Sequence, residues 1–193
     1  MRFIAVLLGL VLLAGCSAPA PSAPAPPTPP GSVAAESSQP AGLAHSVPTV
    51  LDIPKIEVHS TLVQLGLNSD DTIEVPPVST PLQAGWYSYS PTPGEIGPAI
   101  ILGHVDGGGQ KGIFYRLKEL LPGDQISVSR QDGSTARFAV TKVDQISKSE
   151  FSADDVYGDT AAPELRLITC GGSFDRAAHS YRDNIIVYAA LVG

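Results

Sequence analysis

Cysteine is scarce in this chain of 193 residues, which contains only two. Cys16 directly follows an apolar stretch in Leu13-Ala14-Gly15-Cys16, the pattern of a bacterial lipoprotein processing site at which the sulfur is acylated. Cys170 would then have no disulfide partner in an exported, oxidising compartment. A lone thiol is a liability there, so Cys170 is interpreted either as a nucleophile or as an inert buried side chain.

The N-terminus lacks an apolar run of the roughly 20 residues that a membrane-spanning helix needs. Its apolar segment, residues 3–13, is eleven residues long and follows the basic Arg2. Residues 1–15 are therefore predicted to be a signal peptide with a lipobox, and an uncleaved signal anchor is the alternative. Acyl chains on Cys16 would hold the protein at the outer face of the cytoplasmic membrane.

Residues 17–48 lack the apolar content that a hydrophobic core requires. They contain nine of the eighteen prolines, separated mainly by Ala, Ser and Thr. Such a segment is extended and partly polyproline II, so residues 16–48 are predicted to be a disordered tether that carries a folded domain above the membrane. A proline-rich ligand for a partner domain is the alternative interpretation.

Basic residues are also in the minority, with 12 Lys plus Arg against 19 Asp plus Glu and a formal net charge of −7. This acidic balance argues against nucleic acid as a partner. Residues 49–193 are predicted to form one domain of ordinary size. The acidic charge excludes one class of partner but does not identify a substrate.

Long helical periodicity is absent from residues 49–193, which argues against βαβ winding. Turn signals separate apolar or β-branched runs of strand length. These runs are residues 50–53, 56–63, 99–102, 125–128, 136–143, 165–169 and 184–191. Short helical turns are expected within residues 115–121 and 149–156. The pattern predicts an all-β fold, a closed or partly closed antiparallel barrel.

A nucleophilic Cys170 needs a base, because a thiol is mostly protonated at neutral pH. Of the four histidines, His104 follows an apolar run and precedes Val105-Asp106 and three glycines. It stands where a buried strand emerges into a flexible loop, a usual place for a catalytic group. A capping or surface histidine is the alternative.

Arg182 lies twelve residues after Cys170, at the start of the last strand. Its guanidinium keeps its charge and carries a planar fork of donors, so it can stabilise the oxyanion formed when a thiolate attacks an amide. A salt bridge to Asp183 or Asp175 is the structural alternative.

Three ordered motifs together resemble the sortase family. Leu167-Ile168-Thr169-Cys170 resembles the sortase active-site strand, although Arg166 replaces the first Thr of the usual pattern. Gly103-His104-Val105-Asp106 looks like the family's histidine segment, and the nine residues from Tyr181 resemble its arginine strand. The run Cys170-Gly171-Gly172-Ser173-Phe174-Asp175 is most similar to actinobacterial class F. The resemblance covers essentially all of residues 50–192.

The resemblance implies a closed, eight-stranded sortase-type β-barrel with short helical turns and cysteine transpeptidation. By analogy, Cys170 attacks the Thr–Gly amide of an LPXTG-like sorting signal in a surface protein. His104 protonates the leaving amine, Arg182 holds substrate carbonyls and the oxyanion, and Thr169 contacts substrate. A peptidoglycan precursor or another amine of the cell wall accepts the acyl chain. No cofactor and no metal is implied.

Other interpretations concern the anchor and the chemistry. Sortases usually carry a transmembrane signal anchor, so a lipobox at Cys16 departs from the family. An L,D-transpeptidase would place His-Gly before its cysteine, which Ile168-Thr169 does not match. A metal site from His104, Asp106 and Cys170 has suitable ligand types but no evident fourth ligand. A non-catalytic surface lipoprotein that serves as a binding module is the alternative from a different class.

Overall fold

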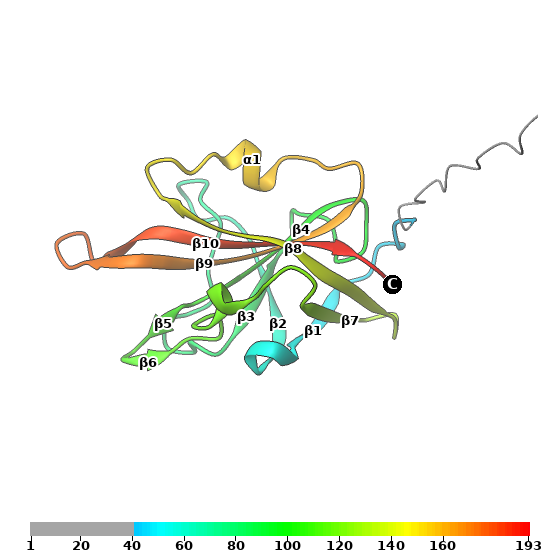
Figure 1. Ribbon diagram of the computed structural model, residues 1–193, viewed down its shortest axis with the longest axis horizontal. Coiled ribbons are helices and arrows are strands. Elements are labelled where there is room, and N and C mark those ends of the chain that lie inside the picture. The colour runs from blue at the N-terminus through cyan, green and yellow to red at the C-terminus, as the bar shows by residue number, and fades with distance from the viewer. Residues whose placement is uncertain (1–40) are drawn as a thin grey trace, which may run out of the picture. The chain divides into compact units, whose positions relative to one another are not determined.

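The computed structural model describes residues 41–193 (Figure 1). Its elements are, in chain order, β1 (Pro48–Ile53), η1 (Pro54–Ile56), β2 (Val58–Leu65), β3 (Ala84–Tyr87), β4 (Gly97–Gly103), β5 (Asp106–Gly107), β6 (Gln110–Lys111), η2 (Leu117–Glu119), β7 (Gln125–Arg130), β8 (Thr135–Ser147), α1 (Ala153–Tyr157), β9 (Pro163–Asp175) and β10 (Ser180–Leu191). Within this part of the chain, no helix has the length and apolar character needed to cross a membrane.

Eight strands close into a barrel in the order β1-β2-β3-β4-β9-β10-β8-β7, which confirms the predicted fold class. The expectation that every pairing is antiparallel was wrong, because β2 pairs with β3 and β4 pairs with β9 in parallel. A parallel pair needs a long crossover connection instead of a tight hairpin. Here the long segments between β2 and β3 and between β4 and β9 supply these connections, and the second contains β5 to β8 and α1.

The barrel interior is filled by alternate side chains of the strands. In β8, Phe138 and Val140 are buried, whereas Thr141 is exposed. β4 is buried at every position because its outer face is also covered. There, Ile100 and Leu102 pack in a second apolar cluster with Val156 of α1. Strands buried on both faces have continuous apolar sequences, as this one does.

Several element boundaries differ from those predicted. The strand expected at residues 56–63 begins at Val58, because Pro54 starts a turn of 3₁₀-helix. The strand expected to end at Thr169 continues to Asp175 as part of a hairpin with β10. β3 was not predicted. The two short helical turns are confirmed, and α1 is capped by Ser152, whose side chain accepts from the Asp155 N–H.

The folded domain begins before the predicted boundary at Thr49. The Leu43 N–H donates to the Gly94 carbonyl oxygen, and Leu43 and Val47 pack against the barrel core. The predicted tether therefore ends several residues too late, because its last apolar side chains are part of the core. The predicted signal peptide, Cys16 and residues 17–40 lie outside the described residues.

Candidate active site

Cys170 lies where β9 loses one of its two neighbouring strands. The parallel pairing of β4 with β9 ends at Leu102 and Ile168, whereas β9 and β10 remain paired at Cys170 and Asn184. At Cys170, one edge of β9 is thus still hydrogen-bonded to β10, whereas the edge that faced β4 has no neighbouring strand among the described residues. The opening forms a cavity of about 560 Å³, and the half-buried Cys170 is part of its wall.

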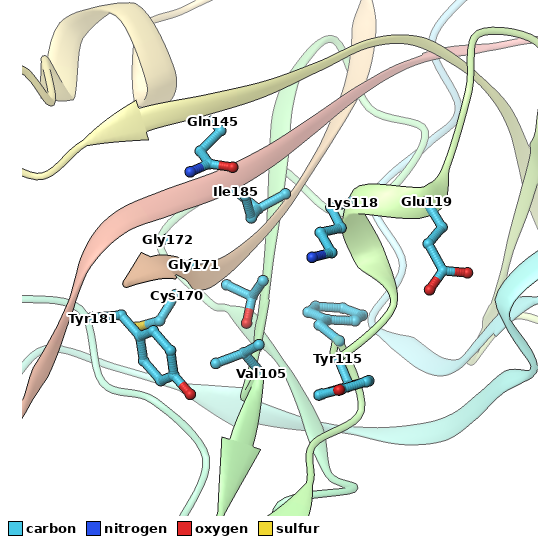
Figure 2. A pocket seen from close by; sticks show the side chains of 12 residues that line it. Val105, Tyr115, Lys118, Glu119, Gln145, Cys170, Gly171, Gly172, Tyr181 and Ile185 are labelled. Atoms are coloured by element: carbon cyan, nitrogen blue, oxygen red, sulfur yellow. The ribbon is translucent and has the colours of Figure 1, made fainter. Parts of the chain in front are cut away.

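Figure 2 shows the walls of this cavity, hereafter the thiol cavity. Cys170 and Tyr181 stand on one side, and Tyr115 and Lys118 face them across the opening. The full lining consists of Val105, Phe114, Tyr115, Lys118, Glu119, Gln145, Thr169, Cys170, Gly171, Gly172, Tyr181 and Ile185. Aromatic, aliphatic and charged side chains thus surround one thiol.

Thr169 is the buried polar neighbour of the nucleophile. Its side chain is 4% exposed, and Oγ1 has no hydrogen-bond partner among the described residues. An unpaired buried hydroxyl costs free energy, because buried polar groups are nearly always hydrogen-bonded. Thr169 also lines the thiol cavity, so this hydroxyl belongs to the wall beside Cys170.

His104 follows the last residue of β4 and is fixed by contacts on both its backbone and its ring. Its carbonyl oxygen accepts a hydrogen bond from the Phe114 N–H at 3.0 Å. Its Nε2 lies 2.5 Å from the Pro76 carbonyl oxygen, and because a carbonyl only accepts, Nε2 carries a proton. His104 and Cys170 both line a smaller cavity of about 180 Å³, so the fold brings these two predicted residues together.

Arg182 stands farther out, on the β9–β10 hairpin. Its side chain is 66% exposed, and Nη2 donates to Asp175 Oδ2 at 3.1 Å, the salt bridge named above as the alternative. Among the described residues that line the two cavities containing Cys170, Arg182 is absent. The backbone N–H groups of Ala178 and Ala177, and then Arg182, lower the pKa of Asp175 by donating to its carboxylate.

A bulge in the hairpin separates Arg182 from Cys170. Tyr181 pairs with Phe174 and Asp183 pairs with Gly171, so two residues of β9 stand opposite Arg182. The first of them, Gly172, has φ = +72°, and a Cβ atom on it would lie 2.2 Å from Asp183 Oδ2. Only glycine fits this backbone without strain. The geometry of the bulge therefore explains why Gly172, the second residue after the nucleophile, is glycine.

Tyr181 joins the histidine segment to the arginine strand, a contact that was not predicted. Its hydroxyl donates to the Asp106 carboxylate, and this bond, followed by burial, raises the pKa of Tyr181 to about 12. The Phe174 ring packs edge-on against Tyr181, with 5.1 Å between ring centroids. Both partners lie within the motifs, but nothing in the sequence pairs positions 75 residues apart.

Lys148 is the second residue that the sequence did not reveal. Its Nζ lies 3.7 Å from Cys170 Sγ and 2.8 Å from Ser180 Oγ. The lysine follows β8 directly, in a polar stretch that carries no motif. A cation therefore stands beside the thiol, and it is not the arginine of the motif.

Within residues 41–193, no three side chains of His, Cys, Asp or Glu gather as a metal ion would require. The alternative metal site of His104, Asp106 and Cys170 thus gains no support from geometry. Asp106 instead accepts the Tyr181 hydroxyl.

Residues 51–192 match the family model described as the sortase domain. The chain therefore belongs to the sortase family. Among curated protein sequences, none matches it. The assignment to class F is finer than this match and stays a prediction.

Solved sortase structures share the fold at low sequence identity. A sortase D5 transpeptidase of Clostridium perfringens is 22% identical, with a TM-score of 0.56 over 77% of this chain and 79% of that one. Sortase A of Corynebacterium diphtheriae is 21% identical, with a TM-score of 0.55 over 78% of this chain and 62% of that one. Sortase C1 of Streptococcus agalactiae is 20% identical, with a TM-score of 0.56 over 75% and 67%. The barrel is thus a sortase fold.

Proposed function

We propose that this protein is a cysteine transpeptidase that cleaves an LPXTG-like sorting signal between Thr and Gly and joins the acyl chain to an amine of the cell wall. One observation carries the proposal. Cys170, the only cysteine of residues 41–193, lines a peptide-sized cavity and shares a second one with His104, in a chain that belongs to the sortase family.

The reaction has two halves that use the same pair of side chains. The Cys170 thiolate attacks the carbonyl carbon of Thr, and the C–N bond breaks as the His104 imidazolium gives its proton to the glycine nitrogen. A thioester on Cys170 remains. An incoming amine then attacks the thioester and loses a proton to His104, so an amide forms, the C–S bond breaks and the thiolate returns.

Arg182 and Thr169 are assigned to binding. The planar fork of Arg182 suits substrate carbonyls and the oxyanion of each tetrahedral intermediate. In this structure the arginine is engaged with Asp175, so substrate has to compete for it or draw it inward. The unpartnered Oγ1 of Thr169 supports its contact with substrate at the wall of the thiol cavity.

The class F assignment belongs to the same proposal. It is supported by the roles that the structure gives to the residues after the nucleophile. Gly172 forms the bulge, Phe174 packs on Tyr181, and Asp175 binds Arg182. The Cys-Gly-Gly-X-Phe-Asp run is thus one structural unit that shapes the cleft.

Incubation of the full-length protein with a fluorogenic LPXTG peptide tests the reaction. We expect cleavage between Thr and Gly, an acyl adduct on Cys170 in mass spectra, and a ligated product when an amine acceptor is added. Cys170→Ala is the control and should show neither cleavage nor adduct. Retained cleavage by this variant, or no cleavage of any LPXTG-like library peptide by the native protein, would contradict the proposal.

The anchor is a separate part of the proposal. We place the domain at the outer face of the cytoplasmic membrane, held by an acylated Cys16 and a proline-rich tether of about thirty residues. Mass spectrometry of the native protein should find a mature chain that starts at lipid-modified Cys16. Residues 1–13 intact, with Cys16 unmodified, would replace the lipid anchor with a signal anchor.

A further inference from the structure

Lys148 is held beside the nucleophile by contacts with two other strands. Its backbone N–H donates to the Arg182 carbonyl oxygen at 2.9 Å, which ties the end of β8 to β10. Its ammonium donates to Ser180 Oγ at 2.8 Å and to Cys170 Sγ at 3.7 Å. Hydrogen bonds therefore fix both the backbone of Lys148 and the ammonium at the end of its side chain, although the residue is exposed.

The two cations near the nucleophile differ in what they contact. Arg182 donates to Asp175, whereas Lys148 contacts the sulfur itself. A positive charge at this distance favours the thiolate over the neutral thiol, because it interacts only with the charged form. Lysine suits this task, since its ammonium is a compact point charge, whereas the arginine fork suits carbonyl oxygens.

We propose that Lys148 is the electrostatic partner of the Cys170 thiolate, and that Ser180 aims its ammonium at the sulfur. The proposal deepens the transpeptidase function and rests on it for its biological meaning. It divides the work between two cations. Lys148 stabilises the nucleophile before attack and again when the thioester collapses, which leaves Arg182 available for the substrate carbonyl and the oxyanion.

Other charged and titratable groups also face the sulfur or its cation. His104 and Asp106 follow β4, and His179 and Tyr181 belong to the β9–β10 hairpin. The charged and titratable side chains that line the two cavities containing Cys170 are His104, Asp106, Tyr115, Lys118, Glu119, His179 and Tyr181, and the β9–β10 hairpin adds Asp175, Arg176, Arg182 and Asp183. A test of Lys148 must therefore change its charge in steps and leave these groups in place.

Alkylation of Cys170 by iodoacetamide measures the thiolate directly and needs no substrate. The full-length protein is treated at a series of pH values, and modification is quantified by mass spectrometry on the tryptic peptide of residues 167–176, so Cys16 does not contribute. Lys148→Gln should slow alkylation of Cys170 at pH 7 about 3- to 10-fold, and the difference from the native protein should shrink at high pH, where the thiol ionises without help. Lys148→Glu should slow alkylation of Cys170 more than Lys148→Gln does. The alkylation rate of Lys148→Arg should stay within about twofold of the native rate.

Two further variants and a change of ionic strength test whether the alkylation rate depends on the charge of Lys148. Lys142→Gln is the matched control, because Lys142 is an exposed lysine within β8 that pairs with Asp144 instead of the thiol. Cys170 in this variant should be alkylated at the native rate. Ser180→Ala should fall between the native protein and Lys148→Gln, since the ammonium loses its guide but keeps its charge. High salt should narrow the difference between Lys148→Gln and the native protein, because exposed charges are screened.

An unchanged alkylation profile in Lys148→Gln would overturn the proposal. Equal losses in the Gln, Glu and Arg variants would also overturn it, because packing rather than charge would then be responsible. The readout is separate from the transpeptidase test. If alkylation follows the charge at position 148 but the protein cleaves no sorting peptide, the proposed function is refuted and the role of Lys148 stands. If the protein cleaves the peptide but alkylation does not follow that charge, the function stands and the role of Lys148 is refuted.

Discussion

The two halves of β9 belong to one continuous strand but have different environments. In residues 163–169 every side chain except Glu164 is buried, between β4 on one edge and β10 on the other. In residues 170–175 the strand keeps only β10, and residues 172–174 are exposed. Cys170 is the first residue of the second half. The nucleophile thus sits on a rigid strand but at its first open position.

This difference separates stability from chemistry along a single strand. The doubly paired half is anchored by apolar packing in both clusters, through Leu167 inside the barrel and Ile168 outside it. The singly paired half has few apolar contacts, so its residues are free to contact a ligand. Substitutions in the first half should therefore cost folding free energy, and those in the second half should cost activity.

The largest effect is expected from the side chains around the open half. His104→Ala removes the general acid and Arg182→Ala removes the carbonyl clamp, and loss of one such donor lowers kcat by about 10²–10³. Arg182→Lys should rescue poorly, because a point charge lacks the planar fork. Steady-state cleavage of the LPXTG peptide measures this, and thermal unfolding should change little. Near-normal turnover of Arg182→Lys would mean that Arg182 acts through charge alone or is structural.

Leu167→Ala tests the closed half. Leu167 is fully buried in the barrel core, so truncation should lower the free energy of unfolding by about 2–5 kcal/mol. Denaturant titration gives this value, and activity per folded molecule should stay within a few-fold of native. Leu121→Ala is the control, because Leu121 is 62% exposed and its truncation should stay within about 0.5 kcal/mol. Equal losses for both leucines would show that burial does not distinguish them.

Gly172→Ala tests the bulge that ends the regular pairing. Gly133, in the β7–β8 turn, has φ = +85° and open space around it, so Gly133→Ala should cost only the backbone strain of about 1–2 kcal/mol. Gly172→Ala should cost more, since the new methyl group also collides with Asp183. It should slow peptide cleavage as well, whereas Gly133→Ala should not. Equal stability and full activity in both variants would show that the bulge at Gly172 does not contribute to activity.

The smallest effect is expected from Asp175→Asn. The folded-state pKa of Asp175 is lowered, so its contribution to stability is present above the ordinary aspartate value of 3.8 and is lost as pH falls through the folded-state pKa. The variant should melt slightly below the native protein at pH 7, and the gap should close below about pH 4. Melting curves across this range measure the gap. A gap that persists in acid would assign the loss to the turn geometry instead of the charge.

Local patterns were sufficient to predict most of the barrel strands, the barrel class and the motif residues, although β3 was missed. Alternating side chains such as Phe138 and Val140 identify a strand and its buried face, and turn residues mark its ends. The position of His104 after an apolar run indicated the end of a buried strand. These signals all lie within a few residues of one another, so they do not depend on which strands become neighbours.

By itself, the sequence determined an all-β sortase domain with one thiol beside a glycine pair, because strand alternation, turn chemistry and the motifs are local. Only the tertiary structure decided that β4 and β9 run in parallel and diverge just before Cys170. It also decided that Arg182 pairs with Asp175, that Tyr181 reaches Asp106, and that Lys148 contacts the sulfur. The physical reason is register. The two-residue period of a strand specifies which face of the sheet each side chain occupies. Closure of the barrel and the bulge at Gly172 decide which residue of the neighbouring strand lies opposite it.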